Sequence, residues 1–96
     1  MFTVYHADET TFTQPHPAFS LDDRTGFTSV AIVEARNLEE VFCLTNHKFS
    51  QKPWWENDQV HTGGKTGMRS TSVGDVVVGN EGAFRCEMSG WSEIKE

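Results

Sequence analysis

The 96 residues of this chain suffice for one small domain with a thin core, in which we expect a single hydrophobic cluster. Acidic residues outnumber basic ones by 14 to 8, and the resulting formal charge of −6 argues against nucleic acid as a partner. The chain has two cysteines, no long apolar stretch and no signal-like N-terminus. These features argue against a disulfide-stabilised secreted domain and a membrane protein, so we expect a cytoplasmic location.

The N-terminal third predicts two strands separated by a long loop. Residues 2–6 alternate and are rich in β-forming side chains, and residues 28–34 repeat this pattern. In the second strand we expect Val30 and Ile32 on one face. The loop, at about residues 7–27, is polar and contains two prolines. Three apolar side chains in it are candidates for anchoring it to the core: Phe12, Phe19 and Leu21.

One convincing helix follows, beginning after Asn37. This residue can cap the helix, and Glu40 stands three positions later, as in a capping box. An apolar stripe with helical spacing comes next: Leu38, Val41, Phe42 and Thr45. Cys43 lies within this helix and Cys86 within a later strand pattern. Both are predicted to be small core residues, with a disulfide between them as the less favoured alternative.

The second half of the chain predicts a long irregular excursion and then a hairpin. Residues 48–67 are irregular, with Pro53 and three glycines. Strands are expected at 76–78 and 83–88, joined by a turn at 79–82, before a closing segment at 90–94. We therefore predict a single α+β domain over residues 1–96. Its mostly antiparallel sheet should have four or five strands, with one principal helix packed on it.

Candidate catalytic and metal-binding patterns are weak. Gly64-Lys65-Thr66 lacks the earlier glycine that a phosphate-binding loop requires, because Gln59 occupies that position. None of the four histidines has a second His or Cys at a usual metal spacing. We therefore expect a non-enzymatic protein without a cofactor or a metal.

Trp54-Trp55 is the strongest indication of a binding surface. Two consecutive residues in a loop cannot easily turn toward the same core, and tryptophan is enriched at interface hot spots. One of the two rings should therefore be partly exposed, although both could instead cover a small core. The residues predicted to bind a partner are Lys52, Trp54, Trp55, Arg69 and Trp91.

The segment Arg69-Ser70-Thr71-Ser72-Val73-Gly74-Asp75 is interpreted mainly as a turn that leads into a strand. Ser70 and Ser72 can hydrogen-bond the turn backbone, Gly74 can adopt a positive φ, and Asp75 can accept backbone amides. Arg69 could then pair with Asp75 or with the end of the helix.

This segment, followed by a hairpin and by Gly90-Trp91, resembles the R-S-x-S-V-G-D pattern of small YodL-like proteins from phages and other mobile elements. The resemblance covers roughly residues 28–94 and implies an accessory protein, without known catalytic residues. The expected function is binding to a host protein, with inhibition of host defence or growth machinery as the outcome. The alternative is a small-molecule or nucleotide-binding module with an anion pocket near Lys65 and Arg69. The sequence leaves open whether the chain forms a homodimer.

Overall fold

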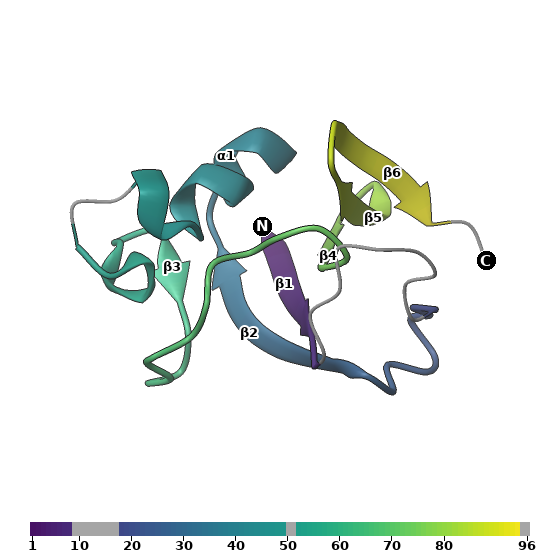
Figure 1. Ribbon diagram of the computed structural model, residues 1–96, viewed down its shortest axis with the longest axis horizontal. Helices are drawn as coiled ribbons and strands as arrows, with labels where there is room; N and C mark the ends of the chain where they lie inside the picture. Colours follow the sequence, from purple (N-terminus) through teal and green to yellow (C-terminus); the bar gives the residue numbers. More distant parts are fainter. Residues whose placement is uncertain (9–17, 50–51, 95–96) are drawn as a thin grey trace.

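An antiparallel sheet with one α-helix on it forms the framework of the chain in a computed structural model (Figure 1). The structure describes residues 1–8, 18–49 and 52–94. Within these ranges the sheet has six strands in the order β3-β2-β1-β4-β5-β6. The strands are β1 (Phe2–Ala7), β2 (Phe27–Val33), β3 (Val60–His61), β4 (Val76–Gly79), β5 (Gly82–Glu87) and β6 (Gly90–Ile94). The expected α+β class is confirmed, with a slightly larger sheet than predicted.

The extra strand comes from the excursion predicted to be irregular. This excursion, residues 48–67, contains two short 3-10 helices followed by β3. They are η1 (His47–Phe49) and η2 (Trp54–Glu56), and η1 begins one residue before the predicted excursion. Only two residues of β3 pair with β2. A strand this short gives no readable alternation, which explains why the sequence did not indicate it.

A bulge in β2 changes which side chains face the core. Val4 pairs with Ala31 and Tyr5 pairs with Ser29, so Val30 has no partner in the register. The extra residue shifts the alternation along the strand. Val30 and Ala31 are consequently both buried, whereas Ile32 is 45% exposed. The prediction that Val30 and Ile32 share a face is therefore wrong.

Helix α1 (Leu38–Leu44) begins as the sequence predicted. The Asn37 side chain accepts a hydrogen bond of 2.8 Å from the backbone N–H of Glu40. Val41 is fully buried against the sheet. Cys43, two residues later, points away from that face and is exposed, so the prediction that it belongs to the core is wrong. Cys86 is buried as predicted, and both thiols are free.

The sheet carries a hydrophobic cluster on each face, in contrast to the single cluster expected. Val4, Val33 and Val77 pack with α1 on one face. On the other face Phe19 covers Tyr5 and Phe27, with ring centroids 5.2 and 5.1 Å away. Phe19 therefore anchors the long loop. Of the other two expected anchors, Leu21 is 41% exposed and Phe12 lies outside the described residues.

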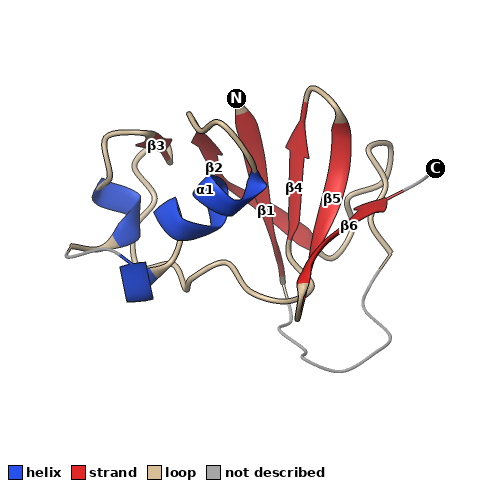
Figure 2. Ribbon diagram, turned by 90° about the horizontal axis from the view of Figure 1, so that it is seen from above, coloured by secondary structure: helices blue, strands red, loops and turns tan. Residues whose placement is uncertain are grey.

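The single helix covers only part of its face of the sheet. Figure 2 shows α1 lying across β1 and β2, with β4, β5 and β6 to one side of it. The helix has seven residues, which corresponds to a length of about 10 Å. Side chains of β5 and β6 that point toward this face therefore border the flank of the helix.

Candidate functional site

The turn at Ser72–Asp75 has the conformation that its glycine suggested. The N–H of Asp75 donates to the carbonyl of Ser72 at 3.0 Å, which closes a four-residue turn. Gly74, in the third position, has φ +94°. Glycine is favoured at this position of a type II turn because a side chain would be strained there.

The carboxylate of Asp75 is fully buried and receives hydrogen bonds from three sides. The backbone amides of Ala7 and Ser72 each donate at 2.8 Å. The guanidinium of Arg69 donates twice, at 2.6 Å to Oδ2 and at 2.8 Å to Oδ1. A buried carboxylate is tolerated when its charge is paired and its lone pairs are satisfied, and both conditions hold here.

Arg69 also donates to two backbone carbonyls. It donates to Ala7 O at 3.0 Å and to Ser70 O at 2.9 Å. The guanidinium thus connects the end of β1 to the turn that precedes β4. Arg69 was predicted to pair with Asp75 or with the end of the helix, and in the structure it pairs with Asp75.

His6 completes this buried cluster and was not singled out from the sequence. Its Nε2 lies 3.0 Å from Thr71 Oγ1 and 3.9 Å from Asp75 Oδ2. Burial lowers the pKa of His6 from 6.5 to about 4, against the opposing effect of the Asp75 charge, while the nearby Arg69 charge lowers it further. The imidazole is therefore neutral at pH 7. A single histidine within a strand pattern carries no signal that would have predicted this contact.

The backbone that leads into the turn also fastens the end of α1. The Thr71 N–H donates to Thr45 O at 3.0 Å, and Ser70 Oγ accepts from the His47 N–H at 2.8 Å. The indole Nε1 of Trp54 donates to Arg69 O at 3.1 Å. Residues 68–75 therefore act as a strap that joins β1, α1 and η2. This geometry agrees with the structural interpretation of Gly74 and Asp75. The Ser70 and Ser72 hydroxyls, predicted to bind the turn backbone, instead contact the His47 N–H and, at 3.5 Å, Nη1 of Arg69.

The two adjacent tryptophans differ in exposure, as expected for neighbours in a loop. Trp54 is fully buried and offers no surface to a partner, so its predicted role in partner binding is wrong. The Trp55 ring is half-buried and packs edge-on against His47 and Trp54 at centroid distances of 5.5 and 5.9 Å. Lys52 is exposed nearby in the sequence.

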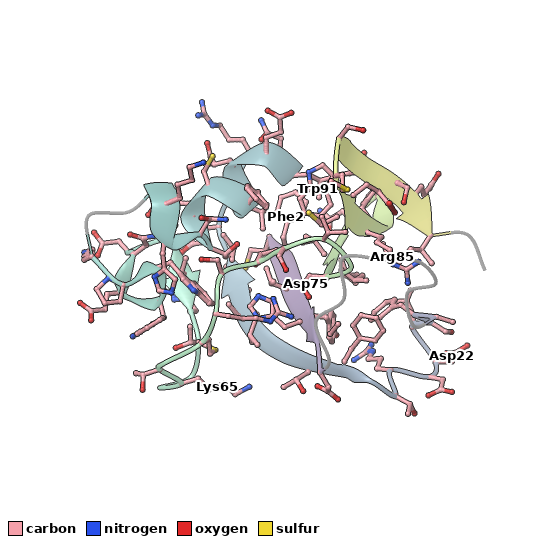
Figure 3. The ribbon with its side chains drawn as sticks, viewed as in Figure 1. Phe2, Asp22, Lys65, Asp75, Arg85 and Trp91 are labelled. Atoms are coloured by element: carbon pink, nitrogen blue, oxygen red, sulfur yellow. The ribbon has the colours of Figure 1, made fainter. Side chains whose placement is uncertain are left out.

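The residues proposed for an anion pocket are not brought together. Arg69 is paired with Asp75, and Lys65 Nζ donates to Ser29 O at 2.6 Å. Figure 3 shows Lys65 at the tip of its loop, well separated from Asp75. This geometry gives no support to the nucleotide-binding alternative. Across the described ranges, no three His, Cys, Asp or Glu side chains are grouped as a metal ion would require.

A groove lies between α1 and the β4–β6 side of the sheet. Its volume is about 700 Å³, and the aromatic side chains that line it are Phe2, Phe84 and Trp91. Figure 3 shows Phe2 and Trp91 close together beneath α1. We call this hollow the Trp91 groove. The other residues that line it are Met1, Ala35, Arg36, Asn37, Leu38, Glu39, Gly79, Asn80 and Glu81.

The Trp91 groove continues past Trp91 into a smaller hollow of about 250 Å³. Glu39 and Trp91 line both parts. The remaining residues of the smaller part are Phe42, Cys43, Cys86, Glu87, Met88 and Gly90. Two carboxylates thus lie along the two parts, from Glu39 and Glu81, and the only cation among the lining residues is Arg36. The Glu87 carboxylate turns to the opposite face of the sheet, where it accepts a hydrogen bond of 3.0 Å from Ser92 Oγ.

Comparison with known proteins does not assign the chain to a group, because no family model, no curated protein and no solved structure matches it. Among the described residues, no helix has the length and apolar character needed to cross a bilayer.

Proposed function

We propose that this chain is a protein-binding module that uses the Trp91 groove as its contact surface. The observation that carries the proposal is the group of aromatic side chains left uncovered beside α1. Phe2, Phe84 and Trp91 are each only partly buried and line one continuous hollow. Aromatic side chains in a concave surface are typical of interface hot spots, because they bury a large area at little cost in conformational entropy.

The titratable side chains of the buried cluster are used within the fold, which supports a structural role for this cluster over catalysis. His6 and Asp75 are buried, and Arg69 is tied to Asp75 and to backbone carbonyls. A general acid or base must reach its substrate, and these groups are held within the fold. The cluster is better suited to stabilising the fold.

The partner that we propose is a host protein in the cytoplasm. The resemblance of the strap to the R-S-x-S-V-G-D pattern of mobile-element proteins motivates this choice, and inhibition of defence or growth machinery would be its outcome. The net charge of −6 supports a partner with a basic surface.

A pull-down from host lysate tests the proposal. The tagged wild-type chain should capture a partner, and Trp91→Ala should lose most of it because it removes the central ring of the groove. Trp55→Ala is the matched control, since it removes another half-buried tryptophan away from the groove. Equal capture by wild type and Trp91→Ala would contradict the proposal. Trp54→Ala is unsuitable because Trp54 is fully buried.

A further inference from the structure

The sheet face beneath α1 is wide enough for a second helix. Six strands spaced about 4.8 Å apart span roughly 24 Å, whereas one helix has a diameter of about 10 Å. Val41 of α1 packs against side chains of β1, β2 and β4, including Val4, Val33 and Val77. Among the described residues, Figure 2 shows no helix over β5 and β6.

The uncovered part of this face is apolar along its floor. Phe84 pairs with Val77 across β4 and β5, so the two side chains point to the face that α1 occupies. Trp91 pairs with Cys86 across β5 and β6 and points the same way. Both aromatic rings line the Trp91 groove, beside the flank of α1 formed by Leu38 and Phe42.

The rim of the groove carries carboxylates. Glu39 stands on α1 and Glu81 on the β4–β5 turn, so carboxylates occur on two sides. Both are exposed, and the nearby Arg36 is paired with Glu40. An occupant that places Lys or Arg side chains at the rim would gain favourable electrostatics at each of these positions.

We infer that the occupant of the Trp91 groove is a basic amphipathic α-helix of the partner protein, lying beside α1. This inference rests on the proposed function and specifies its partner. The apolar face of the helix covers Phe2, Phe84 and Trp91, and its basic side chains meet Glu39 and Glu81. Binding of this kind follows the helix-in-groove mode, with apolar anchors at helical spacing.

A partner strand added to the open edge of β6 would leave this floor uncovered. Strand addition draws its affinity from main-chain hydrogen bonds along the sheet edge. The apolar side chains described here lie on the sheet face instead, between β6 and α1. The observations therefore favour a helix.

Titration of the ¹⁵N-labelled chain with three synthetic peptides tests the inference by NMR. The first carries Leu and Lys at helical spacing, the second has the same composition in strict alternation, and the third replaces Lys by Glu in the helical pattern. The first peptide should shift the Trp91 indole signal and the amides of Leu38 and Phe84. It should bind at least about tenfold more tightly than the other two, and less tightly at high salt.

Four variants give the test its controls. Trp91→Ala and Glu39→Lys should each weaken binding of the first peptide by about tenfold or more. Trp55→Ala and Asp22→Lys should leave it within about twofold, because they make matched changes elsewhere. Asp22 is exposed and lies far from Trp91 in Figure 3.

Several results would overturn the inference. These are preferential binding of the alternating peptide with shifts along β6, equal binding of the acidic peptide, and no binding of the first peptide. If the first peptide does not bind but the pull-down still captures a Trp91-dependent partner, only the inference of a basic helix is refuted. If neither is observed, the proposed function is refuted as well.

Discussion

The guanidinium of Arg69 donates two hydrogen bonds to the carboxylate of Asp75, six residues later, at 2.6 and 2.8 Å. The carboxylate is fully buried, whereas the Arg69 side chain is 34% exposed. The pair therefore sits at the boundary between the interior and the solvent. It holds the strap of residues 68–75 against β1, because the same guanidinium also binds Ala7 O.

Removing the cation of this pair should destabilise the fold strongly. In Arg69→Ala, Asp75 would keep its two backbone amide donors but lose its countercharge in a buried position. We expect a loss of about 3 kcal/mol in the free energy of unfolding, measured by urea denaturation.

Arg69→Lys serves as the control for this prediction. It keeps the positive charge but cannot donate in the bidentate geometry, so its loss should be smaller than that of Arg69→Ala. A loss below about 0.5 kcal/mol in Arg69→Ala would show that the pair does not secure the strap.

Stability should depend on pH through His6. The imidazole is neutral in the folded chain, with a pKa of about 4, and has a pKa of 6.5 when exposed. Protonation between these values favours the unfolded chain, so stability is fully present above pH 6.5 and decreases as the pH falls toward 4. The pKa shift from 6.5 to about 4 corresponds to a loss of up to about 3 kcal/mol in the free energy of unfolding. Urea denaturation at pH 7, 6, 5 and 4.5 measures the effect.

His6→Gln isolates this contribution because glutamine does not titrate. The variant should show a clearly smaller decrease in unfolding free energy between pH 7 and 4.5 than the wild type. Parallel pH profiles for the two proteins would assign the acid sensitivity to other groups.

The two adjacent tryptophans should respond very differently to the same substitution. Trp54→Phe removes an N–H that donates to Arg69 O and Met68 O and leaves a void in the core. We expect a loss of about 2–3 kcal/mol. Trp55→Phe should cost less than about 1 kcal/mol, because that ring is only half-buried. Similar losses in chemical denaturation would contradict the assigned burial.

Gly79 leaves no room for a side chain against Phe2. A Cβ at this position would lie 2.8 Å from two atoms of the Phe2 ring. Gly79→Ala should therefore displace the ring and cost about 1–3 kcal/mol. The combined variant Gly79→Ala with Phe2→Leu should lose less than the sum of the single losses. Strict additivity in this double-mutant cycle would show that the two residues do not interact.

The two thiols should differ in reactivity. Cys43 is exposed, whereas Cys86 is buried and its pKa is raised to about 11, first by burial and then by the Asp75 and Glu87 charges. At pH 8, iodoacetamide should modify one thiol per folded chain and two in urea. Mass spectrometry of the peptides identifies the modified site. Rapid modification of Cys86 in the folded chain would contradict its burial.

The regular parts of the fold were predictable because their signals are local. Asn37 and Glu40 indicated the start of α1, and the hairpin between β4 and β5 follows from its turn residues. Local patterns did not reveal the bulge at Val30, since an extra residue in a strand has no sequence signature of its own. The exposure of Ile32 and the brevity of β3 follow from pairings between distant segments.

The candidate site was predictable only in part. The turn and the possible pairing of Arg69 with Asp75 could be inferred from residue chemistry within seven positions. The contact of His6 with Thr71 spans 65 positions, and no local pattern indicates it. Trp91 was recognised as an aromatic candidate, but the groove around it depends on how α1 lies relative to β5 and β6.

The central position of β1 has a consequence for how the chain acquires its fold. This strand comes from the first residues and pairs with β4, which lies about 70 positions later. The strap contacts of His6 and Ala7 span similar separations, 65 and 68 positions. Such non-local closure slows folding, because the entropy of a large loop is lost before its contacts form. During synthesis, β1 can pair with β2 early, but it can pair with β4 only after β4 has emerged from the ribosome. The centre of the sheet is therefore completed late.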